Sequence, residues 1–354
     1  MKILIKNGTL WDGKNFKRAD ILTEDNKIVE ISDKIQQTAD FLYDATGKIV
    51  SHGLVDIHTH MLGVSSDEFG INTDMSCIPF GVTMAADAGG GHLNKKVLES
   101  SLTKCCIFTS VDIKDDKAVF DYTQKMIDEY GDMAVGLKLY YDDTICSVSS
   151  IKPLAESVDF ARKNNLKVMV HCTNAPVKMA EILDVLEKGD ILTHTYHGGK
   201  SNAMEDGFEC IFKAKEKGVV IDAGMAGGVH TDFSVLKNAI KCGAVPDTIS
   251  TDITRWSAYM RGGIYGMTMC MSIMKYLGMN ETDIFRAVTV NPACVLGREK
   301  EYGILKEGTN ADIAVFEYGN NAFDMTDKWG NRISYEKGYR CVFTMVNGQI
   351  LYRN

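Results

Sequence analysis

The middle of the chain alternates short apolar runs, rich in β-branched residues, with longer segments in which apolar residues recur at helical spacing. The apolar runs are residues 54–60, 81–88, 105–113, 134–141, 166–172, 190–196, 218–223 and 248–253. The clearest helical pattern lies in residues 150–164, 176–187 and 232–242. Continuous apolar runs are typical of parallel strands buried on both faces. Eight such units in roughly 250 residues predict an α/β fold, a (β/α)8 TIM barrel over residues 51–302. An open doubly wound sheet is the alternative, but it usually has fewer strands.

The two ends of the chain have a different pattern, with short strands separated by turns. Expected strands are residues 2–6, 19–23, 27–31 and 48–50 at one end, and 311–317, 341–346 and 350–352 at the other. Asn-Gly and Asp-Gly pairs between them favour tight turns. Neither end has enough strands for a stable sheet. We therefore predict that residues 1–50 and 303–354 join in one small, discontinuous β-sandwich domain beside the barrel.

Six side chains that can bind metal, or can be converted to do so, share a position at or near the end of a predicted strand. They are His58, His60, Lys138, His171, His194 and Asp252. His58 and His60 lie two residues apart, so the alternation of a strand points both to one side. In a TIM barrel the carboxyl ends of the strands form the floor of the active site. The six side chains are therefore predicted to meet at one mouth.

Imidazole and carboxylate groups suit zinc and neighbouring divalent ions. Six groups are too many for one tetrahedral ion, which suggests two ions that share a bridging ligand. A charged lysine would repel the ions, but a buried and neutral Lys138 could add carbon dioxide and become a carbamate. The alternative is a buried amine paired with Asp142 or Asp143. Taken alone, the residues favour that pairing.

Composition narrows the class of protein further. Lys and Arg number 39 against 47 Asp and Glu, without a basic stripe, which argues against nucleic-acid binding. No apolar stretch approaches the roughly 20 residues of a membrane span, and the N-terminal apolar run is too short for a signal peptide. Ten cysteines without a CxxC pair indicate reduced thiols. We expect a cytoplasmic protein with a small-molecule ligand and no membrane partner, whose exposed barrel helices allow a homo-oligomer.

Five stretches of the sequence resemble a known family. Residues 53–60, GLVDIHTH, resemble the first-strand signature of the amidohydrolase superfamily. Residues 287–293, AVTVNPA, together with 303–313, GILKEGTNADI, resemble the usual return into its β domain. Residues 189–194, GDILTH, and 247–252, DTISTD, are similar to the amidohydrolase/deacetylase family of metallohydrolases in particular. The resemblance covers nearly the whole chain and implies a distorted barrel with a binuclear site, commonly of zinc.

The resemblance also assigns roles to the six side chains. His58, His60 and Asp252 would hold the more buried ion. The second ion would be held by His171 and His194, and a carbamylated Lys138 would bridge the two. Hydroxide held between the ions would then attack an amide or ester carbonyl. Asp252 would accept the proton of the attacking water and deliver it to the leaving group.

Substrate contacts are expected from four residues near the same mouth. Tyr140 shares a strand face with Lys138, and His197 follows His194 by three residues. His230 follows a glycine-rich loop, and Arg255 could bind a substrate carboxylate as a fork. For His197 the alternatives are that it orients a metal ligand or caps a loop, and for Arg255 a surface salt bridge. His52 and His92 are expected to be structural, and the methionine-rich stretch 267–274 to be helix core.

The expected reaction is hydrolysis of a small acylated substrate, an N-acyl amino acid or an acylated hydroxy acid. Hydrolysis of a cyclic amide, as by a dihydroorotase or hydantoinase, is the main alternative. Dihydroorotases typically place an arginine directly after the HxH motif, where this chain has Met61. Mononuclear deaminases do not use a lysine from the fourth strand. A metal-free scaffold relative is a third alternative, but such a protein would be expected to have lost ligands.

Overall fold

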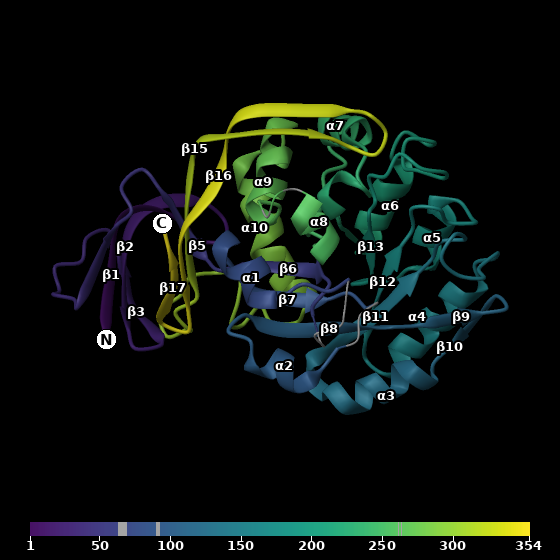
Figure 1. The fold of residues 1–354 in the computed structure, drawn as a ribbon, viewed down its shortest axis with the longest axis horizontal. Coiled ribbons are helices and arrows are strands. Elements are labelled where there is room, and N and C mark those ends of the chain that lie inside the picture. The colour runs from purple at the N-terminus through teal and green to yellow at the C-terminus, as the bar shows by residue number, and fades with distance from the viewer. Residues whose placement is uncertain (63–68, 90–92, 261, 263) are drawn as a thin grey trace.

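The computed structural model describes residues 1–62, 69–89, 93–260, 262 and 264–354 (Figure 1). Its central feature is a seven-stranded sheet in which every neighbouring pair is parallel. In spatial order the strands are β6 (Leu54–Thr59), β7 (Val82–Asp87), β8 (Lys104–Ser110), β11 (Ala134–Tyr140), β12 (Lys167–His171), β13 (Ile191–Thr193) and β14 (Val220–Ile221). They correspond to the first seven predicted runs and confirm the α/β class.

The eighth predicted run, residues 248–253, does not form a regular strand. It makes only isolated parallel bridges, from Thr248 to Asp222 and from Ile253 to Thr59. Asp252 within it has a positive φ of 49°, a backbone conformation that a regular strand does not contain. The structure therefore supports a seven-stranded parallel sheet with a bridged eighth segment, and full barrel closure stays a prediction.

Helices follow most of these strands. They are α1 (Thr73–Cys77), α2 (Lys95–Ser100), α3 (Asp121–Tyr130), α4 (Lys152–Lys163), α5 (Met179–Val185), α6 (Glu209–Lys217), α7 (Phe233–Cys242), α8 (Arg255–Met260), α9 (Met267–Tyr276), α10 (Glu281–Val288) and α11 (Val290–Val295). The three predicted helices appear as α4, α5 and α7. Local signals explain the limits of α7, because Asp232 caps its first turn and Gly243, at φ 90°, ends it.

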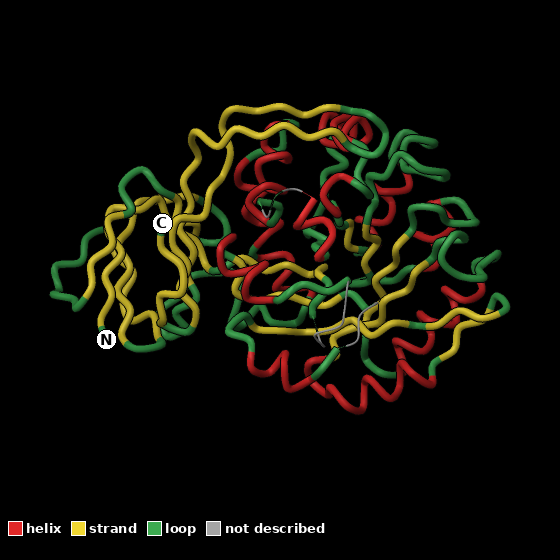
Figure 2. The backbone as a smooth tube through the Cα atoms, in the orientation of Figure 1, coloured by secondary structure: helices red, strands yellow, loops and turns green. Residues whose placement is uncertain are grey.

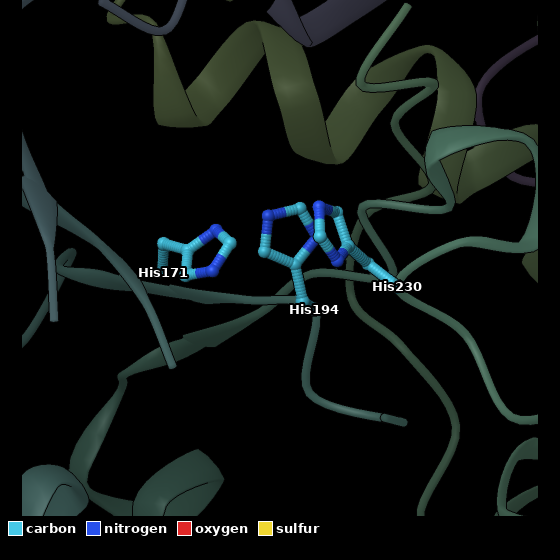
Figure 3. Close-up of side chains that lie close together, drawn as sticks. All are labelled: His171, His194 and His230. Atoms are coloured by element: carbon cyan, nitrogen blue, oxygen red, sulfur yellow. The ribbon is translucent and has the colours of Figure 1, made fainter. Parts of the chain in front are cut away.

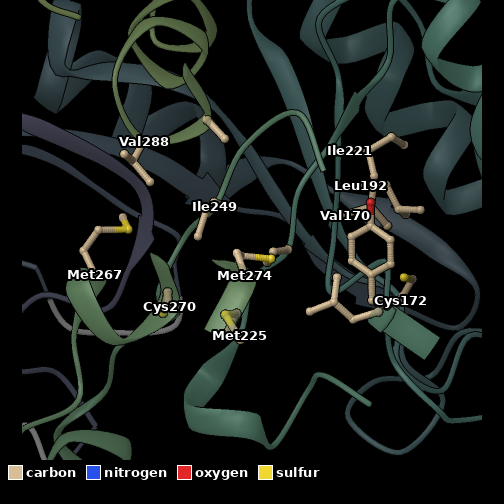
Figure 4. Packing of buried hydrophobic residues seen from close by; sticks show 14 of the residues in the cluster. Val170, Cys172, Leu192, Ile221, Met225, Ile249, Met267, Cys270, Met274 and Val288 are labelled. Atoms are coloured by element: carbon tan, nitrogen blue, oxygen red, sulfur yellow. The ribbon is translucent and has the colours of Figure 1, made fainter. Parts of the chain in front are cut away.

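The methionine-rich stretch is buried helix core, as the sequence predicts. Every residue from Met267 to Met274 in α9 is buried. Met267, Cys270 and Met274 lie in one apolar cluster with Met225 and Ile249 (Figure 4). No helix in the described part of the chain combines the length and the apolar character that a membrane crossing requires.

Both ends of the chain contribute to a second sheet, of eight strands. From the N-terminal end come β1 (Lys2–Trp11), β2 (Phe16–Glu24), β3 (Lys27–Ser32), β4 (Phe41–Asp44) and β5 (Ile49–His52). From the C-terminal end come β15 (Ile313–Thr326), β16 (Arg332–Val346) and β17 (Gln349–Arg353). Antiparallel pairing of β5 with β15 joins the two groups, and the sheet curves around a core to which both ends contribute (Figure 2). The division into domains at residues 50 and 303 stays a prediction.

The hairpin of β15 and β16 is much longer than the sequence predicts. It leaves the curved sheet as a two-stranded arm that extends across the helices toward α7 (Figure 1). On its way it contacts α9, where the backbone N–H of Tyr339 donates to Ser272 Oγ at 2.8 Å. A segment from the end of the chain is therefore brought to the part of the molecule that carries the strand ends. A second, unpredicted hairpin is formed by β9 (Asp112–Lys114) and β10 (Lys117–Val119).

Candidate metal centre

Three of the predicted ligands converge on the carboxylate of Asp252. His60 Nε2 lies 2.8 Å from Asp252 Oδ1, and His58 Nε2 lies 3.1 Å from the same oxygen. On the other side, His194 Nε2 is 3.7 Å from Asp252 Oδ2. All four side chains are buried. The alternation of β6, which places both of its histidines on one side, therefore leads to the geometry that the sequence predicts.

Backbone conformation aims two of these side chains into the site. His194 has a φ of 59° and Asp252 a φ of 49°, both in the left-handed region. This region is unfavourable for non-glycine residues and occurs often at functional sites. The backbone N–H of Asp252 donates to the carbonyl of His58 at 2.7 Å, which ties the eighth segment to β6. His194 therefore stands directly after β13, and Asp252 stands in the bridged eighth segment next to β6.

The partners of each Nδ1 atom determine which ring nitrogen carries the proton. His60 Nδ1 lies 2.8 Å from the carbonyl oxygen of Gly89, and His194 Nδ1 lies 2.6 Å from that of Gly224. A carbonyl oxygen only accepts, so both Nδ1 atoms donate, and each Nε2 atom is the one that faces Asp252.

His58 reaches the same state through a hydroxyl group. Its Nδ1 lies 3.0 Å from Thr193 Oγ1, which itself donates to Asp222 Oδ2 at 2.7 Å. Because the hydroxyl proton is used on Asp222, the oxygen is left to accept from His58 Nδ1. In neutral His58 and His194 the Nε2 atoms are therefore unprotonated where they face Asp252, and His60 Nε2 lies within hydrogen-bond distance of the same carboxylate.

Burial keeps two of these imidazoles, those of His58 and His194, neutral. It lowers the pKa of His58 to about 3 and holds the pKa of His194 well below its ordinary value. The unprotonated His58 Nε2 and the carboxylate of Asp252 are both acceptors, yet they lie 3.1 Å apart. Acceptors crowded in this way fit a positive charge shared between them. Imidazole nitrogen and carboxylate oxygen are the donors that a divalent metal ion takes.

Lys138 is fully buried in the same cluster. Its Nζ lies 3.0 Å from His58 Nε2 and 3.7 Å from Met169 Sδ. Burial lowers the pKa of Lys138 to about 8, which makes a neutral amine accessible near neutral pH. The pairing with a neighbouring aspartate is not formed among the described residues, because Asp142 faces His171 and Asp143 faces Lys200.

A second group of nitrogen ligands lies beside the first. His171, His194 and His230 each offer a ring nitrogen, and these atoms lie within 4.8 Å of one another. Figure 3 shows the three rings side by side. His171 Nε2 is held by Thr173 Oγ1 at 2.8 Å and by Asp142 Oδ2 at 3.3 Å, so its Nδ1 would be the ligand. Asp142 is thus an orienting partner that the sequence did not indicate.

His230 is a candidate ligand that the pattern of predicted strand ends did not include. The sequence placed it only as a substrate contact, but the structure brings its ring to 5.0 Å from His171 and 4.4 Å from His194, measured between centroids. It comes from the loop after the short strand β14, nine residues beyond the strand end. The strand and helix periods of a sequence do not predict where a loop residue of this kind lies. The role of each histidine as a ligand stays a prediction.

The cluster forms the floor of a cavity of about 580 Å³. Tyr140 and His230 line it, and the Tyr140 hydroxyl donates to the carbonyl of Ala88 at 3.3 Å. The structure places His197 elsewhere. It is buried, and its Nδ1 accepts from the N–H of Gly199 at 3.1 Å. Arg255 lines a neighbouring cavity of about 390 Å³. Contact of these four residues with substrate stays a prediction, and His92 lies outside the described residues.

Other lining residues were not predicted. Phe69, Ile145 and Trp256 form apolar parts of the wall, and Lys328 comes from the tip of the β15–β16 arm. Among the residues that the structure describes, Lys328 and Lys138 are the only lining side chains with a basic group other than histidine. His52, expected to be structural, lies apart from both metal-capable groups and is fully buried.

Fold and site together fit the class of hydrolases that use metal ions. A model of the amidohydrolase family matches residues 121–352, more than half of the chain. The chain therefore belongs to the amidohydrolase family and is a hydrolase of carbon–nitrogen bonds. This confirms the family that the sequence motifs indicate.

Relatives agree with this assignment over the full length. A deacetylase of Enterococcus faecalis is 28% identical over 380 residues, which cover 98% of each chain. A dihydroorotase of Lactobacillus acidophilus is 24% identical over 100% of this chain and 99% of its own. Among solved structures, a dihydroorotase has a TM-score of 0.88 at 24% identity, covering 100% of this chain and 99% of that one. An adenine deaminase has a TM-score of 0.85 at 26% identity, covering 99% of each chain.

Proposed function

We propose that the chain is a metal-dependent hydrolase that removes the acyl group from a small acylated substrate, an N-acyl amino acid or an acylated hydroxy acid. The observation that carries the proposal is the convergence of three imidazole nitrogens on Asp252, with a buried lysine in contact. The name of the Enterococcus faecalis relative, which matches along the whole chain, supports deacylation.

Two divalent ions, of zinc in our proposal, would be held by these residues. His58, His60 and Asp252 would bind one ion, and His171 and His194 the other, with His230 close enough to take part. Lys138, carbamylated by carbon dioxide, would place an oxygen on each ion. When bound, such ions polarise a carbonyl and make water nucleophilic near neutral pH.

The protein's own groups would position the substrate and move the proton. Asp252 lines the cavity floor and is the carboxylate nearest to the imidazoles, so it would accept a proton from the attacking water and return it to the leaving nitrogen. The apolar wall of Phe69 and Trp256 would hold the acyl or side-chain portion and exclude water.

Hydrolysis of a cyclic amide is the second candidate. It is favoured by the dihydroorotase of Lactobacillus acidophilus, which matches along the whole chain. The residue after the HxH motif speaks against a dihydroorotase, because it is Met61, whose N–H donates to Asp87 Oδ2 at 2.7 Å. This position supplies no cation to a substrate carboxylate.

The test combines metal analysis with a substrate screen. Protein purified with zinc and bicarbonate is expected to hold about two divalent ions per chain. It should hydrolyse members of a panel of N-acetyl, N-formyl and N-succinyl amino acids of both hands. Acetyl esters and cyclic amides in the same panel separate the candidates. In Lys138→Arg the amine that would form the carbamate is replaced by a guanidinium group, so this variant should hold less metal.

Asp252→Asn is expected to fold normally and to lose turnover by about 10²- to 10⁴-fold, the usual contribution of a positioned proton-transfer group. Near-normal turnover in a folded Asp252→Asn protein would contradict the role of this carboxylate. A protein that binds no metal under these conditions would point instead to a scaffold relative. Metal-loaded protein inactive on the whole panel would overturn the proposed substrate class.

A further inference from the structure

The arm formed by β15 and β16 ends at the mouth of the cavity. Its tip, residues 327–331, lies against the N-terminus of α7, far from the curved sheet in which the arm begins (Figure 1). The cavity wall is thus built from the central fold and from one element of the C-terminal end.

Hydrogen bonds fix the conformation of the tip. Asp327 Oδ1 accepts from the N–H groups of Trp329 and Asn331, each at 2.9 Å. Asp327 Oδ2 accepts from the N–H of Phe233 at 2.7 Å, at the first residue of α7. Asn331 Nδ2 donates to Asp232 Oδ1 at 3.0 Å, the residue that caps the same helix. The turn is therefore closed on itself and attached to α7 through two side chains.

Lys328 is the tip residue that lines the main cavity. Its N–H donates to the carbonyl of Gly228 at 3.2 Å, so it is attached to the loop that carries His230. The side chain is exposed, and among the described residues it forms no ion pair with a carboxylate. Its Nζ lies over the ring of Trp329, 5.8 Å from the centroid, and its charge has no anionic partner in the described part of the chain and is available to a ligand in the cavity.

The other charged groups of the lining are already engaged. Lys138 lies buried at the floor, and Asp252 faces the imidazoles there. Asp142 accepts from Thr144 and Asn174 and pairs with His171. Lys328 lines the same cavity next to the loop of His230, and its exposed side chain lies nearer to solvent than the buried groups at the floor. A substrate that reaches from floor to rim would present one end to each.

We propose that Lys328 binds the carboxylate of the substrate and so restricts the enzyme to anionic acylated compounds. This inference rests on the proposed function and names the charge of its substrate class. A carboxylate complements a single ammonium at the rim, while the acyl bond lies at the floor. The chain has a net charge of −8, so the electrostatic field of the whole protein would repel an anionic substrate. Binding of such a substrate therefore requires a cationic side chain in the cavity.

The test compares two substrates that differ only in charge, racemic N-acetylleucine and racemic N-acetylleucinamide. Lys328→Met removes the charge and keeps the length of the side chain. It is expected to lower kcat/KM for N-acetylleucine about tenfold, through KM, as loss of a charge-assisted contact does. Activity on the amide should stay the same. Lys337→Met, at an exposed position of β16 in the same arm, is the matched control and should change neither value.

Two results would overturn the inference. In the first, Lys328→Met keeps the wild-type preference for N-acetylleucine. In the second, kcat/KM falls equally for N-acetylleucine and N-acetylleucinamide. Either leaves the proposed hydrolase intact. If the wild-type protein hydrolyses neither compound, binding of N-acetylleucine to the zinc-loaded protein is measured by calorimetry. Tighter binding to wild type than to Lys328→Met then supports the inference although the proposed reaction fails. Equal or absent binding overturns it.

Discussion

Thr193 provides the most direct test of the protonation states assigned to the candidate metal centre. Its hydroxyl donates to Asp222 Oδ2 at 2.7 Å and accepts from His58 Nδ1 at 3.0 Å. Thr193→Val keeps the branched shape and removes the oxygen. The N–H of His58 then loses its acceptor in a site where the residue is 1% exposed.

The cost follows from the two groups that the hydroxyl serves. A buried donor left without a partner costs about 1–3 kcal/mol of unfolding free energy. Asp222 is affected less, because it still accepts from Thr248 and Ser250. His58 can avoid the orphaned N–H only by moving its proton to Nε2, the atom that faces Asp252. That tautomer cannot bind a metal ion, so we expect zinc affinity to fall about 10- to 100-fold, as it does when the outer partner of a ligating histidine is removed.

The assay is competition for Zn²⁺ with a chromophoric chelator, together with urea unfolding. Thr193→Ser retains the oxygen and should bind zinc like the wild type. Thr195→Val removes a neighbouring buried hydroxyl that donates only to the carbonyl of Leu192, so it should cost stability without changing zinc affinity. If folded Thr193→Val binds zinc as tightly as Thr193→Ser, the assignment of the His58 tautomer is wrong.

Two further predictions concern stability. Trp11→Phe removes the hydrogen bond of 3.0 Å from Trp11 Nε1 to Thr289 Oγ1, which connects β1 to the end of α10. This variant should lower the unfolding free energy, measured in urea, by about 1–3 kcal/mol and leave the metal content unchanged. Burial lowers the pKa of His197 to about 4, so its neutral form stabilises the fold fully above the ordinary value of 6.5 and less as the pH falls toward 4. Between pH 7.5 and pH 5 the wild type should therefore lose about 2 kcal/mol more than His197→Gln, and equal losses would show that His197 is not buried as a neutral ring.

The sequence predicted those parts of the site that depend on strand period and strand ends. His58 and His60 lie on one side of β6 because a strand repeats every two residues, and Lys138 and His171 lie at the ends of adjacent parallel strands. The first placement depends only on neighbouring residues, and the second follows from the assumption that consecutive strands pair in parallel. The structure brings all six predicted residues into two adjoining groups around Asp252.

Residues placed by loops and by long-range docking could not be predicted in the same way. His230 depends on the conformation of residues 225–232, which contain two glycines at positive φ. Lys328 depends on a hairpin whose position is set by contacts with α7 and α9, about 60 to 100 residues away in sequence. Neither the loop conformation nor the position of the hairpin follows from a periodic pattern in the sequence. The same limit explains why residues 318–340, with their many polar side chains, did not suggest strands.

The eighth segment shows what replaces a regular strand where the chain positions Asp252. Its backbone makes only isolated bridges to its neighbours, but its side chains are held by two buried carboxylates. Asp56 accepts from Thr251 Oγ1 at 2.6 Å, and Asp222 accepts from Ser250 Oγ at 2.6 Å. Thr193 binds the same Asp222, so the position of Asp252 and the proton on His58 depend on one network. Side-chain bonds allow Asp252 the left-handed conformation that a continuous ladder would forbid, and this is why its apolar neighbours resemble a strand in sequence without forming one.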